Sequence, residues 1–293
     1  MQRNAQTHYP ILLVHGLLGF DVIGSISLFH DVRQALRNAG ARVFVPQLSA
    51  THSNEARGAQ LLAQIERVRE RTGADKVNLF GHSQGALAAR YAAAIAPTAV
   101  ASVTSVSGPN QGSEVADVLR KALTPGRLPE QVAEKVAILF ANFLSLMGAE
   151  RGMQQNAIAA LNALTTEGVA TFNDKYPQGL PEIRGGEGRE KVNGVGYYSW
   201  SGVLQNNLPD GGLNTLDPVH ACLCALSRFF VTEIGQNDGL VGRFSSHLGK
   251  VIRSDYPLDH LATLRQPGIA ARHGIDPIDL YVQHAERLKN AGL

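Results

Sequence analysis

Gly81-His82-Ser83-Gln84-Gly85 is the stretch that decides the fold of this chain. An extended run, Lys76-Val77-Asn78-Leu79-Phe80, leads into it, and a helical run over residues 86–95 leads out. A serine hydroxyl is a weak nucleophile, so a hydrolase needs it on a sharp strand-to-helix turn that a histidine can reach. Glycines on either side lack a Cβ and should not clash with the strained serine backbone. We therefore predict that Ser83 is a nucleophile.

The rest of the N-terminal half alternates between strands and helices. Short apolar runs bounded by turn residues occupy 11–14, 42–45, 77–80 and 101–106 and are typical of buried strands of a parallel sheet. Apolar residues at helical spacing occupy 29–39 and 56–72. This order predicts a doubly wound, mostly parallel sheet with helices on both faces. Ligands of such sheets bind beyond the carboxyl ends of the strands, where Ser83 falls.

Composition indicates an ordinary globular protein. The chain has 293 residues, of which 44% are hydrophobic and 18% charged, and no linker or repeat divides it. We expect one domain over 1–293. A formal net charge of +2 gives no reason to expect nucleic acid as a partner. The first eight residues hold no apolar stretch, and no run of about 20 apolar residues occurs, so we expect neither a cleavable signal nor a membrane span.

The two cysteines, Cys222 and Cys224, are two residues apart. Residues at this spacing do not face each other on a helix and point to opposite faces of a strand. We expect free thiols and no disulfide, and a metal site would need further ligands.

A loop after the first strand, His15-Gly16-Leu17-Leu18-Gly19, lies where the α/β-hydrolase fold provides one of its two oxyanion-hole donors. We assign those donors to the backbone N–H groups of Leu17 and Gln84, the second being the residue after the nucleophile. The alternative is that the glycine loop only ends a strand.

Residues 129–147 predict a helix that is unusually apolar for a surface element, with Val132, Val136, Leu139, Phe140, Phe143, Leu144 and Met147 on one broad face. A core helix is one interpretation. A lid that covers the site and turns its apolar face toward a lipid surface is the other.

The remaining catalytic groups follow the nucleophile in this fold, in the order acid, then histidine. Loop positions leave His247 and His260 as candidates for the base. Asp238, in the tight turn Asn237-Asp238-Gly239, is the first candidate for the acid, and Asp210, Asp217 and Asp255 compete with it. The acid must hold the imidazole in the tautomer that can accept the serine proton.

Several blocks together resemble the bacterial true lipases of the Pseudomonas type. They are 9–21, 77–85, 191–202, 237–242, 245–249 and 283–291, and they span nearly the whole chain. The resemblance implies an α/β-hydrolase fold with a helical lid at about 125–150. It also implies that Asp238 is the catalytic acid and that His260, in Tyr256-Pro257-Leu258-Asp259-His260-Leu261, is the base, which leaves His247 structural.

This sequence departs from the family at two features that stabilise its fold, a disulfide and a calcium ion. Family members often carry a disulfide, but the matching positions here are Gly185 and Phe244. The family also binds one structural calcium through two aspartates and two backbone carbonyls. Asp217 matches one aspartate, and Ala262 stands where the other is expected. Calcium prefers six to eight oxygen ligands, so this loss should weaken the site. Gln266 and Ala270 are expected to supply the carbonyls, with water replacing the carboxylate.

A further change lies in the same loop, where Gln266 is followed by Pro267. Some family members have a cis peptide bond here that does not involve proline. A cis bond before proline costs only about 0.5–1 kcal/mol. Our hypothesis is that Pro267 helps to hold the loop that Ala262 leaves less firmly bound to metal.

The combined expectation is a triacylglycerol lipase that acts at lipid–water interfaces through Ser83, His260 and Asp238 and an acyl-enzyme. A carboxylesterase of soluble substrates and a catalytically silent binding protein are the alternatives. We expect no organic cofactor, a monomer, and a secreted protein without a recognisable cleavable signal, with a cytoplasmic location left open. Calcium is the one candidate metal, at a weakened structural site.

Overall fold

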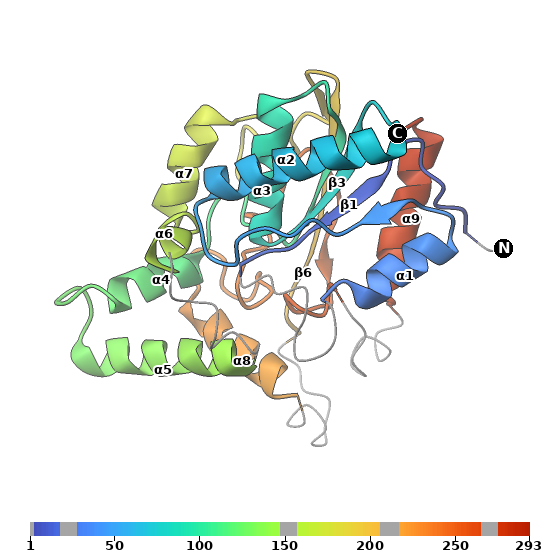
Figure 1. Cartoon of the computed structure of the whole chain (residues 1–293). Helices are drawn as coiled ribbons and strands as arrows, with labels where there is room; N and C mark the ends of the chain where they lie inside the picture. Colours follow the sequence, from blue (N-terminus) through green and yellow to red (C-terminus); the bar gives the residue numbers. More distant parts are fainter. Residues whose placement is uncertain (1–2, 18–27, 147–156, 206–216, 265–274) are drawn as a thin grey trace.

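The computed structural model describes residues 3–17, 28–146, 157–205, 217–264 and 275–293. Strands and helices alternate along the first half of the chain, as the apolar runs predict (Figure 1). The strands are β1 (Ile11–Val14), β2 (Val43–Phe44), β3 (Val77–His82), β4 (Val100–Val106), β5 (Lys191–Val192), β6 (Val195–Gly202) and β7 (Lys250–Tyr256). The helices are α1 (His30–Asn38), α2 (Asn54–Thr72), α3 (Gln84–Ile95), α4 (Glu114–Ala122), α5 (Glu130–Leu146), α6 (Ala157–Asn162), α7 (Thr166–Lys175), α8 (Pro218–Leu226) and α9 (Pro277–Asn290), and a 3₁₀ turn covers Ser227–Phe229.

These strands form one sheet in the order β2-β1-β3-β4-β6-β5, with β7 paired to β6. Every described pairing is parallel except that of β5 with β6. The predicted mostly parallel sheet is therefore confirmed. Ser83 follows β3 directly, so it lies at the carboxyl edge of the sheet, where open α/β folds bind their ligands.

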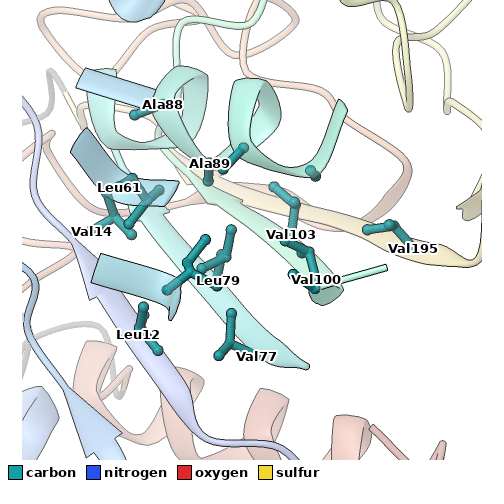
Figure 2. Close-up of a cluster of buried hydrophobic side chains, with 14 of the residues drawn as sticks. Leu12, Val14, Leu61, Val77, Leu79, Ala88, Ala89, Val100, Val103 and Val195 are labelled. Atoms are coloured by element: carbon teal, nitrogen blue, oxygen red, sulfur yellow. The ribbon is translucent and has the colours of Figure 1, made fainter. Parts of the chain in front are cut away.

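Helices cover both faces of the sheet. Alternate side chains of β1 point to opposite faces, as the strand geometry requires. Leu12 and Val14 pack with α2 and α3 in one buried cluster (Figure 2). Ile11 and Leu13 join the cluster beneath α1 and α9. The two-sided burial explains why these strands read as continuous apolar runs. Among the helices that the structure describes, none has the length and apolarity needed to cross a membrane.

His284 on α9 is buried in the second of these clusters, with only 1% of its surface exposed. Its Nε2 lies 2.8 Å from Thr104 Oγ1, and the Arg287 guanidinium donates to its Nδ1 over 3.0 Å. An imidazole that accepts at Nδ1 is neutral. Burial, and next the charge of Arg287, hold the pKa of His284 well below its ordinary value.

We expect this histidine to make the fold acid-sensitive. The unfolded chain takes up a proton at His284 below pH ~6.5, whereas the folded chain does not, so the free energy of unfolding falls as the pH drops through that range, by at most about 1.4 kcal/mol per pH unit. Urea denaturation at several pH values between 7.5 and 5 should show a shallower fall for His284→Gln than for the parent chain. The exposed His30 provides the control variant His30→Gln, and parallel curves for all three proteins would contradict the assignment.

Candidate active site

Ser83 occupies a strained backbone conformation between β3 and α3. Its φ of 55° and ψ of −129° lie outside the regions that residues with a side chain ordinarily adopt. Such strain costs roughly 1–3 kcal/mol and persists only where the surrounding structure enforces it. Here the Ser83 amide donates to the Val106 carbonyl of β4 over 3.0 Å, and its own carbonyl accepts from Ala86 of α3. The predicted sharp turn is thus present.

The flanking glycines also permit a close approach of backbone that the sequence did not reveal. A Cβ built on Gly81 would lie 2.6 Å from the Ala86 backbone nitrogen, and one built on Gly85 would overlap the carbonyl oxygen of Val14. The nearest atoms belong to the first turn of α3 and to the end of β1. The glycines therefore allow α3 to pack closely on the sheet, and that packing fixes the serine.

Two of the predicted catalytic residues, Asp238 and His260, form a buried pair. Asp238 Oδ2 accepts from His260 Nδ1 over 2.9 Å, and a second bond of 2.9 Å joins the His260 amide to the Asp238 carbonyl. The other carboxylate oxygen, Oδ1, accepts from the amides of Leu240 and Val241. These contacts fix the Nδ1–H tautomer, so the Nε2 lone pair of His260 is available for a proton.

The main chain of His260 is anchored as well. Its carbonyl accepts from His82 Nε2 over 2.9 Å and from Thr263 Oγ1 over 2.8 Å. Burial, followed by the nearby His260, holds the pKa of His82 well below its ordinary value, so this neighbour stays neutral. His82, next to Ser83 in sequence, therefore links the nucleophile turn to the histidine loop.

The competing histidine and acids lie in other surroundings. His247 Nδ1 contacts the Gly186 carbonyl at 2.9 Å, and His247 does not line the cavity that holds Ser83. Asp217 caps α8 by accepting from the amides of Val219 and His220. The half-exposed Asp255 pairs with Arg253 at 2.6 Å. Asp210 is outside the described residues.

The expected oxyanion donors flank the serine. Leu17 follows Gly16, where an added Cβ would come 2.7 Å from Ser83 Cβ, so this loop lies directly against the nucleophile. Gln84 begins α3, and the first amides of a helix have no partner within it. Leu18 and Gly19, the end of the loop, lie outside the described residues.

A buried arginine, Arg57, supports this loop, and our sequence interpretation missed it. Its guanidinium donates to the carbonyls of His15 and Gly16, and it also contacts the Ser49 carbonyl. Burial lowers its pKa to about 9, so it remains charged at neutral pH. The spacing contained the signal, since Arg57 lies four residues before Leu61 on the buried face of α2.

Ser83 and His260 line the same apolar cavity, whose volume is about 90 Å³. Leu17 contributes to one side, and the remaining wall is mostly apolar side chains of α4, α5 and the segment before α7: Val115, Ala116, Leu119, Phe140, Phe143, Leu161 and Leu164. Pockets that hold drug-sized ligands have about 300–1,000 Å³. A molecule with several long acyl chains therefore needs the cavity to widen.

Helix α5 begins at Glu130, one residue after the start of the helix expected over 129–147, and is described as far as Leu146; Met147 is outside the described residues. It is apolar on two sides. Phe143 and Leu144 are buried in a cluster with α4, α7 and α8, while Ile138 is 52% exposed. Figure 1 shows α5 running beside α8 at the end of the molecule away from α2. It covers the cavity and presents apolar surface to solvent.

An ion pair links the segments at which the family resemblance would place a disulfide. The positions Gly185 and Phe244 are neighbours, since a Cβ on Gly185 would lie 3.1 Å from the Phe244 ring. Beside them, Arg184 donates to the buried Glu233 carboxylate over 2.5 Å, and the Phe244 amide donates to its other oxygen over 2.6 Å. Both cysteines are free thiols, as expected. The loop that carries Asp238 is closed by these contacts.

Asp217 and Ala262 stand at the two positions where the family resemblance expects calcium-binding aspartates. One oxygen of Asp217 already caps α8, and Ala262 packs against Leu258. Within the described ranges, no group of three or more His, Cys, Asp or Glu side chains could hold a metal ion. At the positions where the family resemblance expects two calcium-binding aspartates, the described side chains thus provide one carboxylate, that of Asp217. Gln266, Ala270 and the bond before Pro267 are outside the described residues.

Instead, a histidine–aspartate pair that the sequence interpretation missed lies next to Asp217. His220 Nδ1 is 2.8 Å from Asp259 Oδ2, and both side chains are almost fully buried. The hydrogen bond to Asp259, then that to Cys224, raises the pKa of His220 to about 10. The imidazole is therefore charged at neutral pH.

Comparison with known proteins places this chain in a family. A model of the α/β hydrolase fold matches residues 9–231. The chain is 58% identical over 293 residues to a triacylglycerol lipase of Pseudomonas fragi, with 100% of both chains covered. It is 46% identical to a triacylglycerol lipase of Vibrio cholerae, covering 100% of this chain and 91% of that one. The crystal structure of Staphylococcus hyicus lipase has a TM-score of 0.63 at 18% identity, with 99% of each chain covered, and shows the shared fold. The chain thus belongs to the α/β-hydrolase superfamily and, within it, to the bacterial lipases.

Proposed function

We propose that this lipase hydrolyses triacylglycerol esters at lipid–water interfaces through a covalent acyl-enzyme on Ser83. One observation carries the proposal: a serine on a strained turn and a histidine fixed by a buried aspartate line the same apolar cavity. The names of the relatives in Pseudomonas fragi and Vibrio cholerae support the substrate class.

In the first half of the reaction, Ser83 Oγ attacks the ester carbonyl while His260 Nε2 takes its proton. Asp238 keeps the proton of His260 Nδ1 in place and stabilises the imidazolium that forms. The amides of Leu17 and Gln84 would donate to the oxygen that becomes negative, and one such donor typically contributes about 10²–10³ in kcat. His260 then protonates the leaving alcohol, a diacylglycerol.

In the second half, His260 takes a proton from water, which attacks the acyl carbonyl. His260 then returns this proton to Ser83 Oγ as the acyl–oxygen bond breaks, which releases the fatty acid and regenerates the free serine. The apolar walls of the cavity suit an acyl chain. None of these steps calls for an organic cofactor. We further expect a monomeric, secreted protein, and these two expectations stay predictions.

The test of this function combines a substrate and a covalent probe. Emulsified triolein should release oleic acid in proportion to enzyme. A p-nitrophenyl alkylphosphonate should transfer its phosphonyl group to Ser83 Oγ, with one p-nitrophenolate released per chain and the added mass located on the peptide that contains Ser83. Labelling of another residue, or no hydrolysis of either triolein or soluble esters, would contradict the proposal, the second result in favour of a silent binding protein.

We expect α5 to act as a lid that makes the rate depend on the interface. Apolar surface on its outer side favours contact with lipid, and its displacement would widen the cavity. With tributyrin, the rate should rise sharply once its solubility limit is passed. The variant Ile138→Ser should weaken this rise, whereas Ile95→Ser, at an equally exposed position on α3, should not. A smooth saturation curve through the solubility limit would favour the carboxylesterase of soluble substrates.

A further inference from the structure

The loop that carries His260 is tied to α8 by the pair of His220 and Asp259. Asp259 immediately precedes His260, and its Oδ2 receives the bond from His220 Nδ1. Its other oxygen, Oδ1, accepts from the amides of Leu261 and Ala262 over 3.0 and 2.8 Å. One carboxylate therefore fixes the backbone on the far side of His260 and also joins it to another element.

The partner of this carboxylate is itself held in place. In the first turn of α8, the amide of His220 donates to Asp217, the residue that caps the helix. The His220 Nε2 lies 3.4 Å from the Sγ of Cys224, one turn further along the helix. Both ring nitrogens thus have partners. The imidazole is about a tenth exposed and has little freedom to turn away from Asp259.

This connection reaches the proposed lid as well. The thiol of Cys222, on the same helix, donates to the Leu139 carbonyl of α5 over 3.4 Å. Helix α8 therefore contacts both the element that covers the cavity and the turn that carries the base. A contact between α8 and the turn that carries His260 can keep His260 aligned with Ser83 while α5 moves.

We propose that His220 and Asp259 are positioning residues, which hold the His260 turn at the place where the family resemblance implies a calcium ion. The pair does not touch the reacting atoms. It acts by keeping His260 Nε2 aligned with Ser83 Oγ, because misplacement of a catalytic group by about 1 Å can lower the rate roughly 10²-fold. This inference rests on the role proposed above for His260.

The test measures how fast Ser83 is phosphonylated and how many sites react, using the p-nitrophenyl alkylphosphonate. The variants are His220→Gln, Asp259→Asn and the double variant, with the exposed His30→Gln as control. Asp259→Asn keeps an oxygen for the amides of Leu261 and Ala262, so the turn can still form. We expect about one site per chain in every protein, a rate constant lowered about 10- to 100-fold in each single variant, and no further loss in the double variant. The KM for tributyrin should stay the same.

Other outcomes would overturn the proposal. A reduced number of reactive sites with an unchanged rate constant would indicate only a structural role, and unchanged rates in both single variants would remove the role altogether. Losses that add up in the double variant would show that the two residues do not act as a pair. If His220→Gln does not fold, Asp259→Asn alone decides between these outcomes.

Two further experiments complete the test: one removes or adds calcium, and the other uses the variant His260→Ala. Chelator should leave the parent rate constant and melting temperature unchanged, and added calcium chloride should not restore the variants. The opposite result would assign the holding role to the metal. An active His260→Ala variant would refute the proposed function itself, whereas an inactive His260→Ala beside an unaffected His220→Gln would refute only this inference.

Discussion

His260→Ala is expected to lower kcat/KM for ester hydrolysis by about 10⁴-fold or more, because the serine then has no group to accept its proton. His260 is buried, lines the same cavity as Ser83 and is bonded to Asp238. Initial rates with a soluble p-nitrophenyl ester would measure the loss, and circular dichroism would show that the variant is folded.

His247→Ala is the matched control for this variant. His247 is also buried, and its Nδ1 also bonds to an oxygen, but that oxygen is the carbonyl of Gly186. Its removal should cost stability and leave the turnover of the folded fraction close to that of the parent chain. If His247→Ala lost as much activity as His260→Ala, the assignment of the base would have to be revised.

Gly85→Ala is expected to have the largest effect on stability. A Cβ at this position would overlap the carbonyl oxygen of Val14 and come 2.8 Å from that of His15. Because both atoms belong to the backbone of the sheet edge, α3 would have to move away, and we expect a loss of about 3 kcal/mol or more. Ser83 would move with α3, so the activity of the remaining folded protein should fall as well.

Gly73→Ala separates the effect of a clash from that of backbone conformation. Gly73 ends α2 with a φ of 66°, and a Cβ built there meets nothing within 4 Å. An alanine at this site should cost only about 1 kcal/mol. Urea denaturation of both variants would measure the difference. Similar losses at the two glycines would contradict the close packing of α3 on β1.

The sequence was sufficient where the signal is local. A strand, a glycine-flanked serine and a helix placed Ser83 at the sheet edge, and the same reasoning placed Leu17 and Gln84 beside it. Arg57 was equally accessible from its helical spacing. The choice of Asp238 and His260 was not local, since residue type and turn context left several acids and two histidines. The family resemblance favoured this pair, and the structure brings it together.

Contacts between distant segments could not be predicted in this way. His220 and Asp259 are 39 residues apart, and Arg184 and Glu233 are 49 apart. All four residues are of types that are common on protein surfaces, so their identity does not mark them. Only the fold brings the members of each pair together. The absence of a calcium ligand at position 262 and of cysteines at 185 and 244 was visible in the sequence. The contacts that Arg184, Glu233, His220 and Asp259 make near these positions were not visible in it.

The Arg184–Glu233 ion pair also affects the conditions under which the loop around Asp238 can form. A loop closed by a disulfide needs an oxidant to form and opens again under thiol reductants. Here the loop around Asp238 is closed by one ion pair and by amides that donate to the same carboxylate, and the chain has only two cysteines, both free. Closing this loop therefore needs no oxidant, and thiol reductants should not open it, so the enzymes that make and shuffle disulfide bonds are not required for it.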